Sequence, residues 1–232
     1  ASAVAALLAV LGALILLPRT AKRLTMALLT VVGVLPALTT GIAVDRVLAA
    51  LIAAAVSAGM LAVVLVGARL RGVDAVVTPV WSALSAVAAL IAVTAAFDGH
   101  VAGPVLLGLA TVVAVAGRSS RVARWAAVGF ATIGGALYVA YAPPSILVHA
   151  TPLVPPVAVA TLAASALSIA CTLTIARVCT SAQEVDDDSA RLIWAAAAAV
   201  TVYSVTMLTV TAGVMFGGPD GGFLAGHMAA TI

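Results

Sequence analysis

Long uncharged runs of apolar residues are the feature that most limits how this chain can fold. Charged residues make up 8% of the 232 residues, and breaks at charged or Pro/Gly clusters divide the chain into eight apolar runs. A membrane-spanning helix needs about 20 such residues. We therefore expect an all-α, polytopic transmembrane helix bundle. The predicted spans are 1–17, 24–44, 47–67, 75–97, 101–116, 125–142, 157–176 and 192–216, with the start of a ninth near 224.

The two ends of the sequence both lie in apolar segments. Residue 1 falls inside ASAVAALLAVLGALILL, which lacks the basic region and cleavage site of a signal peptide, and a new apolar segment has begun where the sequence stops at Ile232. We expect 1–232 to be a single transmembrane domain and an excerpt of a longer polytopic chain. The spacing of Cys171 and Cys179 indicates neither a metal site nor a disulfide.

The basic residues predict how the chain is oriented. Ten of the eleven lysines and arginines fall in the loops after spans 1, 3, 5 and 7, and only Arg46 falls in a loop after an even-numbered span. Cytoplasmic loops of membrane proteins carry the excess of Lys and Arg. The bias predicts a multi-pass protein of the plasma (inner) membrane, with its Lys/Arg-rich loops in the cytoplasm and residue 1 on the outer side.

Aromatic side chains near the span ends agree with this orientation. Tryptophans occur at the inner ends and other aromatic residues at the outer ends, as in the aromatic belts of membrane proteins. The inner set is Trp81, Trp125 and Trp194, and the outer set is Phe97, Tyr138, Tyr141 and Phe216.

The outer loops predict turns of two kinds. In 98–100 an Asp-Gly-His sequence provides a glycine that tolerates positive φ, which predicts a tight turn. The loop 143–156 holds five of the ten prolines and is expected to be extended and stiff rather than helical.

On the inner side, Asp187, Asp188 and Ser189 are residues that suit a helix N-terminus, and a weak cation or partner site is the alternative.

Two Gly-His steps raise the question of an internal repeat. GHVA at 99–102 opens span 5, and GHMA at 226–229 opens the ninth segment. An even number of helices separates them, so the units of a true repeat would be parallel four-helix units with His100 and His227 in the first turns of equivalent helices. Chance similarity in an Ala/Val-rich chain is the other interpretation.

The predicted spans are poor in groups that support ion coupling. No ionisable residue lies in the middle of a span, which weighs against a carrier that uses a midplane charge. Small and hydroxyl residues occur there instead and indicate helix packing or, alternatively, a hydroxyl-lined groove for a lipid or glycan. These residues are the pairs Ala55 and Gly59, Ala131 and Gly135, and Ala164 and Ser168, together with Thr201, Ser204, Thr206, Thr209 and Thr211.

Acidic residues and histidines gather in the predicted outer loops. Together they could act as acid and base, or bind a divalent cation and through it a diphosphate-linked substrate. Solvated turn residues and helix caps are the simpler interpretation, and no spacing specifies a metal, so we predict no metal and no cofactor. The candidate outer-face polar cluster is Asp45, Asp98, His100, His149, Asp220 and His227.

Two motifs carry a family resemblance. YAPPSILVHATPLVPP and the terminal GGFLAGHMAAT, with Phe223, Gly226 and His227, resemble the actinobacterial branch of a family of large polytopic bacterial membrane proteins catalogued as a domain of unknown function. The resemblance implies further helices beyond both ends, and it carries no established substrate or catalytic residue.

Three functions remain open from sequence. The leading hypothesis is a non-enzymatic membrane protein that handles or transports an apolar envelope component. The alternatives are a membrane-embedded transferase that uses a lipid-linked donor, and a helix-packing scaffold in a membrane complex. Expected partners are membrane lipids and other membrane proteins, whereas the scattered net charge of +3 argues against nucleic acid.

Overall fold

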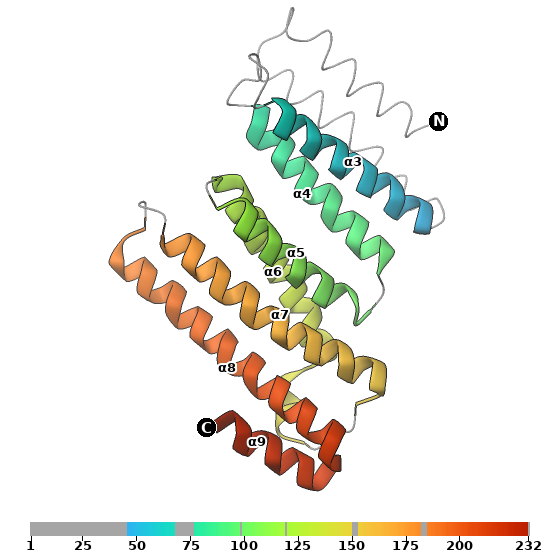
Figure 1. Ribbon diagram of the computed structural model, residues 1–232, viewed down its shortest axis with the longest axis vertical. Coiled ribbons are helices and arrows are strands. Elements are labelled where there is room, and N and C mark those ends of the chain that lie inside the picture. Colours follow the sequence, from blue (N-terminus) through green and yellow to red (C-terminus); the bar gives the residue numbers. More distant parts are fainter. Residues whose placement is uncertain are drawn as a thin grey trace, which may run out of the picture. The chain divides into compact units, whose positions relative to one another are not determined.

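The structure, a computed structural model, describes residues 46–67, 77–97, 99–118, 120–149, 153–181 and 185–231, and its regular elements over these residues are all helices. The chain divides into two compact units, Ala1–Phe97 and Asp98–Ile232, and each is considered by itself. Figure 1 shows the helices of both. The predicted spans 1–17 and 24–44 lie outside the described residues. A single domain over 1–232 stays a prediction.

The first unit contains a pair of packed helices, α3 (Arg46–Gly67) and α4 (Val77–Ala96). Their bounds agree with the predicted spans 47–67 and 75–97. Ser57 and Ser85 join them through reciprocal hydrogen bonds, because each hydroxyl donates to the other's backbone carbonyl, at 2.9 and 3.0 Å. Apolar helices gain little from burying one another in lipid, so such paired hydroxyls help to hold two helices together.

The second unit contains five α-helices and two short turns of other helix types. The α-helices are α5 (Ala102–Ala116), α6 (Arg121–Tyr141), α7 (Pro155–Thr180), α8 (Asp187–Gly217) and α9 (Phe223–Thr231). A 3₁₀ turn, η3 (Pro144–Leu147), follows α6, and a π-type turn, η4 (Gly218–Gly222), joins α8 to α9. The predicted spans 101–116, 125–142, 157–176 and 192–216 are each present as a helix, and the ninth segment begins at Phe223.

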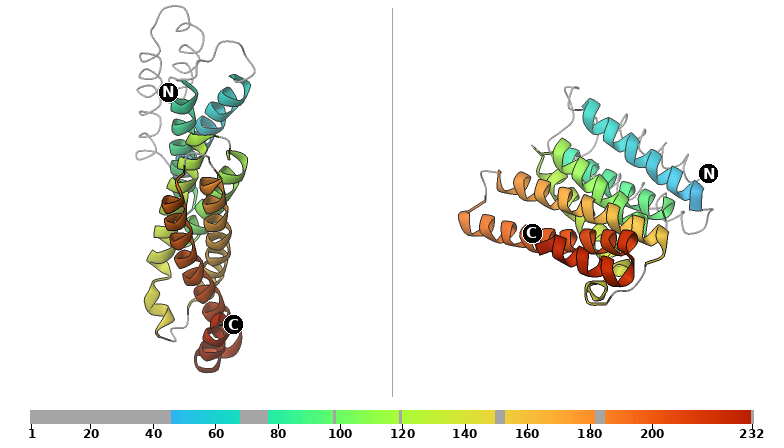
Figure 2. Two further views of the ribbon diagram at one scale, coloured as in Figure 1. Left: turned by 90° about the vertical axis from the view of Figure 1, so that its left-hand side faces the viewer. Right: turned by 60° about the horizontal axis from the view of Figure 1, so that its bottom comes forward.

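Consecutive helices of the second unit run antiparallel and pack side by side (Figures 1 and 2). α5 packs on α6 and also on α7, and α7 packs on α8. The core is made of small residues with a few large ones, and Leu106, Tyr138 and Met207 are among its fully buried side chains. Helix N-termini and C-termini therefore alternate between the two ends of this bundle.

Local sequence explains where several helices begin. Ser120 caps α6 by accepting a hydrogen bond from the Ala123 amide, so α6 starts about one turn before the predicted residue 125. Pro155 begins α7, where the missing N–H of proline costs nothing. Gly99 adopts a φ of +51°, which confirms the glycine-dependent turn predicted before α5.

The proline-rich loop is not extended throughout, and that prediction was wrong in part. Pro143 is extended, with φ −70° and ψ 157°, but the next four residues form η3. The reason is that Pro144 occupies the first position of this turn, where its fixed φ suits a helix and no N–H is required.

α9 folds back on α8 through glycines that bring the two backbones together. A Cβ added at Gly226 would lie 2.7 Å from both the Thr209 carbonyl oxygen and the Val210 Cα. Gly213 and Gly222 face each other so closely that a Cβ on either would overlap the other's backbone. Gly218, with a φ of +77°, makes the turn. The sequence 213–226 thus forms a glycine-dependent helical hairpin.

Small-residue pairs in α3, α6 and α7 were predicted to pack against other helices. Both members are buried in α7 alone. Ala164 and Ser168 are buried in α7, which confirms that pair. Ala55 and Gly59 are exposed, and the buried positions of α3 are Ala50 and Ala53.

In α6 the prediction missed the register by one residue. Gly134, not Gly135, lies against α5, where an added Cβ would meet Leu106 at 3.0 Å, whereas nothing lies within 4 Å of such an atom at Gly135.

Three stretches of helix in the described part of the chain are long and apolar enough to cross a membrane. They are Arg121–Tyr141, Pro155–Thr180 and the combined stretch Asp187–Thr231. The fold is therefore all-helical over these residues and compatible with a membrane protein.

Candidate functional site

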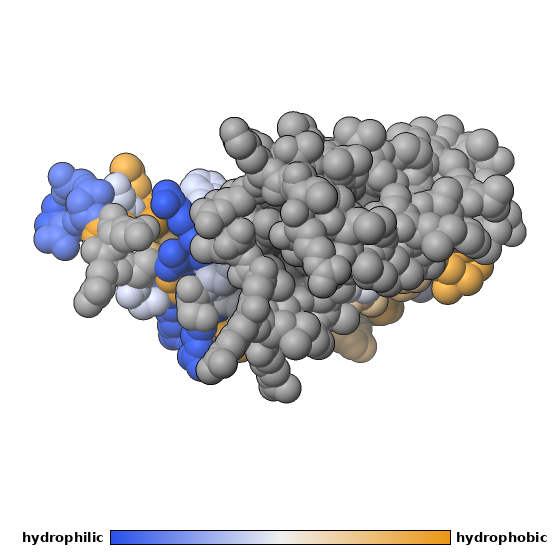
Figure 3. All heavy atoms as spheres, turned by 90° about the horizontal axis from the view of Figure 1, so that it is seen from above, coloured by the Kyte–Doolittle hydropathy of each residue, from blue (hydrophilic) through white to orange (hydrophobic). Residues whose placement is uncertain are grey.

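The two ends of the second unit differ in charge. All five arginines of residues 98–232 lie at or near the end where α5 and α7 finish and where α6 and α8 start: Arg118, Arg121, Arg124, Arg177 and Arg191. Hydrophilic surface gathers toward one side of the view in Figure 3. We call the end of the second unit that carries these five arginines the arginine end. The opposite end, with η3, η4 and the start of α9, carries no Lys or Arg in this unit.

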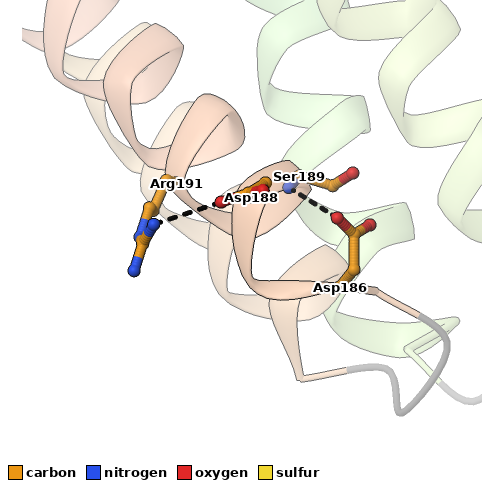
Figure 4. A network of polar contacts seen from close by, with 4 residues as sticks. All are labelled: Asp186, Asp188, Ser189 and Arg191. Atoms are coloured by element: carbon orange, nitrogen blue, oxygen red, sulfur yellow. Dashed lines mark hydrogen bonds and ion pairs between the residues drawn. The ribbon is translucent and has the colours of Figure 1, made fainter.

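The acidic residues at the arginine end cap α8. Asp186 is the N-cap and accepts a hydrogen bond of 3.3 Å from the Ser189 amide, while Asp188 pairs with Arg191 at 3.1 Å (Figure 4). Hydrogen bonds from Ser189 hold the pKa of the Asp186 carboxyl below its usual value. The structure confirms a helix N-terminus at the acidic cluster, with α8 starting at Asp187 rather than at the predicted residue 192. The Asp188–Arg191 pair is highly exposed and contributes little to stability.

A cavity of about 250 Å³ lies at the opposite end, lined by residues of η3, the segment after it, the start of α7, the last turns of α8 and the first residue of α9. We call it the α7–α8 cavity. On the side of η3 and α7 its apolar walls are Ile146, Leu153, Pro155 and Ala158. On the side of α8 and α9 they are Val210, Val214, Met215 and Phe223.

Two polar residues line this otherwise apolar cavity. His149 is exposed and lies two residues after η3, and Thr211 is 3% exposed on α8. The Thr211 hydroxyl is buried and has no hydrogen-bond partner in the structure. A buried polar group without a partner costs about 1–3 kcal/mol. Thr206 and Thr209 in the same helix avoid this cost by donating to the carbonyls of Val202 and Val205.

The predicted polar cluster is only partly within the described residues. Asp45 and Asp98 lie outside them. His100 is half-buried in the turn before α5, and Asp220 is exposed in η4. Of the described members only His149 lines the α7–α8 cavity. Convergence of the six residues stays a prediction.

The repeat hypothesis requires His227 to lie in the first turn of its helix, and it does not. Its helix begins four residues earlier, at Phe223, because the glycine turn ends there, whereas His100 precedes the first residue of α5. The His227 Nδ1 lies 3.1 Å from the carbonyl oxygen of Phe223, and the two rings pack with centroids 4.5 Å apart. Nδ1 therefore donates to its own helix. His100 and His227 are not equivalent in position within their helices.

Tyr138 is a core residue rather than part of an outer aromatic belt, so that assignment was wrong. It is 2% exposed because it follows Ala127, Phe130 and Gly134 along the buried face of α6. Its hydroxyl lies 2.7 Å from the Ser165 hydroxyl. Ser165 donates its proton to the Thr161 carbonyl at 2.7 Å, so Tyr138 is the donor to Ser165.

Other polar contacts between helices were missed from sequence. Ser204 donates to Ser168 at 3.0 Å, which links α8 to α7, and the Tyr203 hydroxyl donates to the Ala142 carbonyl at 2.6 Å at the end of α6. The available signal was the presence of hydroxyl residues in apolar helices, but sequence did not indicate which of them pair. By contrast, Trp125, Trp194 and Phe216 are exposed near helix ends, as the predicted belts require.

The described residues do not bring together three His, Cys, Asp or Glu side chains in a group that could hold a metal ion. Comparisons with protein families, curated proteins and solved structures found no match to this chain.

Proposed function

We propose that this chain is a multi-pass plasma-membrane protein that binds and handles an apolar component of the cell envelope at its outer face. The observation that carries the proposal is the α7–α8 cavity. Its walls are apolar, and it lies at the end of the unit opposite the arginines.

The charge difference supports the orientation of this site. If the arginine end faces the cytoplasm, as the positive-inside rule requires, the cavity opens at the outer surface. The exposed Trp125 and Trp194 support the same placement, since each lies in the first turns of a helix that starts at the arginine end. This proposal also includes eight spans over the whole sequence. It further includes membership of the polytopic family that the motifs at 141–156 and 221–231 resemble.

The nature of the cavity favours binding over catalysis. Apolar walls with one or two polar groups are typical of ligand sites, but this cavity is smaller than the roughly 300–1,000 Å³ of sites that enclose a whole small molecule. A cavity of this size accommodates part of a lipid chain. The proposal is therefore a carrier or accessory protein for a lipid-like component rather than a transferase.

The test is whether lipid occupies the cavity. The chain would be purified in nanodiscs with a photoreactive hydrocarbon probe, and labelled residues would be identified by mass spectrometry. We expect labels on cavity residues, and we expect Ala158→Leu and Val214→Phe, which fill the cavity from opposite walls, each to remove them. Val159→Phe is the matched control, because Val159 neighbours Ala158 but is 58% exposed. Labelling that Ala158→Leu and Val214→Phe leave unchanged would contradict the proposal.

A further inference from the structure

We infer that the arginines around the turn between α5 and α6 bind the headgroup of an anionic phospholipid, whose acyl chains lie along the exposed face of α6. This site lies at the arginine end, away from the α7–α8 cavity, so it goes beyond the proposed function. It rests on the charge of the turn, on an exposed tryptophan beside it and on the apolar surface that continues from that tryptophan.

The turn between α5 and α6 carries a concentrated positive charge. Arg118, Arg121 and Arg124 fall within seven residues, and the sequence has no acidic residue between Asp98 and Glu184. None of the three arginine side chains forms an ion pair with a residue in the described part of the chain. Guanidinium groups bind phosphate through paired, charge-assisted hydrogen bonds. The turn therefore offers the charge and the donors that an anionic headgroup requires.

Two of these arginines share one side of α6 with an exposed tryptophan. Arg124 lies three residues and Trp125 four residues after Arg121, which places all three on the same side of the helix. Arg121 is exposed, and Trp125 is 68% exposed. Tryptophan is enriched at the headgroup level of a bilayer. Positive charge therefore lies beside a residue that marks the membrane surface, which favours a lipid headgroup over a soluble anion.

An exposed apolar face continues from Trp125 along α6. Its residues follow one another at steps of four and three, which places them in one row on the helix. We call this row the α6 stripe: Trp125, Gly129, Ile133, Ala136 and Val139. The row is about 21 Å long at the helical rise per residue, and half of the hydrocarbon core of a bilayer is about 15 Å thick. An acyl chain in the same leaflet can therefore contact apolar surface over its whole length.

The start of α8 lies at the same end of the unit and lacks this charge. Residues 184–191 contain four acidic residues and one arginine. That arginine, Arg191, is already paired with Asp188 at 3.1 Å (Figure 4). The acidic residues repel an anionic headgroup, although Trp194 is exposed there as well. Arg191 therefore provides a matched control for the arginines of α6.

The experiment compares two photoreactive phospholipids with identical acyl chains, a phosphatidylglycerol and a phosphatidylcholine. Each is added at trace level to phosphatidylcholine nanodiscs that contain the full chain. The reactive group lies in the middle of one acyl chain, and the labelled residues are identified by mass spectrometry. We expect the phosphatidylglycerol to label the α6 stripe more strongly than the phosphatidylcholine does.

Three variants test whether the arginines cause this preference. Arg121→Gln combined with Arg124→Gln should lower it about 3- to 10-fold, because each basic residue near the surface adds to the attraction of an anionic lipid. Arg121→Lys combined with Arg124→Lys should retain most of it, because the charge is unchanged. Arg191→Gln is the control and should leave it unchanged. Thermal unfolding curves show whether each variant remains folded.

The native protein provides a test that needs no substitution, since the preference for phosphatidylglycerol should fall as the salt concentration rises. A preference that salt does not reduce would contradict the inference, as would equal labelling by the two lipids.

Two further results would overturn the inference. If the double glutamine variant keeps the preference, or if Arg191→Gln lowers it equally, the anion does not bind at the α5–α6 turn. If inorganic phosphate abolishes the preference at an ionic strength where chloride does not, the ligand is a soluble anion rather than a lipid. Labelling of the α7–α8 cavity is read from other residues, so the proposed function stands or fails separately.

Discussion

At the scale of single residues, hydrogen bonds from hydroxyl groups join neighbouring helices. Ser57 and Ser85 join α3 to α4, and Tyr138 and Ser165 join α6 to α7. Apolar surface gives no net attraction between helices in lipid, so shape and these few hydrogen bonds select the partners. The loss of one such bond should therefore be measurable.

We predict that Tyr138→Phe lowers the free energy of unfolding by about 1 kcal/mol, because it removes the hydrogen bond to Ser165 and leaves the ring in place. Unfolding would be followed by steric trapping in bicelles. In a Ser165→Ala background the same change should cost clearly less, because the partner is already absent. Equal costs in the two backgrounds would show that the bond does not contribute.

At the scale of helices, caps and glycines decide where each element starts and turns. Asp186 fixes the beginning of α8, and glycines along α8, η4 and the start of α9 let the chain reverse. The α8 cap lies at the end of α8 away from the cavity, whereas the hairpin carries Phe223, which lines it.

For the α8 cap we predict that Asp186→Ala increases hydrogen exchange at the Ser189 amide and lowers thermal stability at pH 7, whereas Asp186→Asn has a smaller effect. The folded pKa of Asp186 is lowered, so its contribution is complete above the ordinary Asp pKa of about 3.9 and is lost as the pH falls through the folded value. The difference between native and Asp186→Ala protein should therefore shrink below about pH 4. No difference in exchange at pH 7 would refute the cap.

For the α8–α9 hairpin we predict that Gly226→Ala detaches α9, because the new Cβ meets the backbone of Thr209 and Val210 rather than a movable side chain. The expected cost is about 1–3 kcal/mol. Gly221→Ala is the control, since nothing lies within 4 Å of the added atom. Limited proteolysis at 218–231 would report the detachment. Equal cleavage of the two variants would count against the close packing.

Much of the helix layout was predictable from sequence, because charged and Pro/Gly clusters end apolar runs wherever they occur. The buried faces were less predictable. Gly134 packs and Gly135 does not, yet both are small residues in an Ala-rich helix whose outer face is also apolar. Lipid does not demand a polar outer face, so the sequence contains no amphipathic signal that identifies the inner one.

The candidate site was less predictable than the helices. His149 was selected for its outer loop, but the cavity beside it depends on how η3, α7, α8 and α9 come together. Thr211 looked like one of five similar hydroxyl residues in span 8. The structure distinguishes Thr211 as the one of the five that lines the cavity, and its buried hydroxyl has no partner; both follow from side-chain packing, which spacing along the sequence does not specify.

At the scale of the whole molecule, we predict the orientation from the arginine end. After replacement of Cys171 and Cys179 by alanine, a membrane-impermeant thiol reagent applied to intact cells should label Ser145→Cys in η3 and leave Ser181→Cys unlabelled. Both serines are exposed, and they lie at opposite ends of the second unit. Permeabilised cells provide the control for reactivity. The reverse pattern would invert the topology and place the cavity on the cytoplasmic side.

The order of helix packing bears on how the chain is made. α3 packs on α4, α5 on α6, α7 on α8 and α8 on α9, so each described helix has a sequence neighbour as a partner. Contacts between neighbours in sequence require little loop closure and form early, and synthesis proceeds at about 5–20 residues per second. Each hairpin can therefore assemble soon after its second helix has emerged from the ribosome. The packing of α5 on α7 skips a neighbour, and it must wait until α7 has been made.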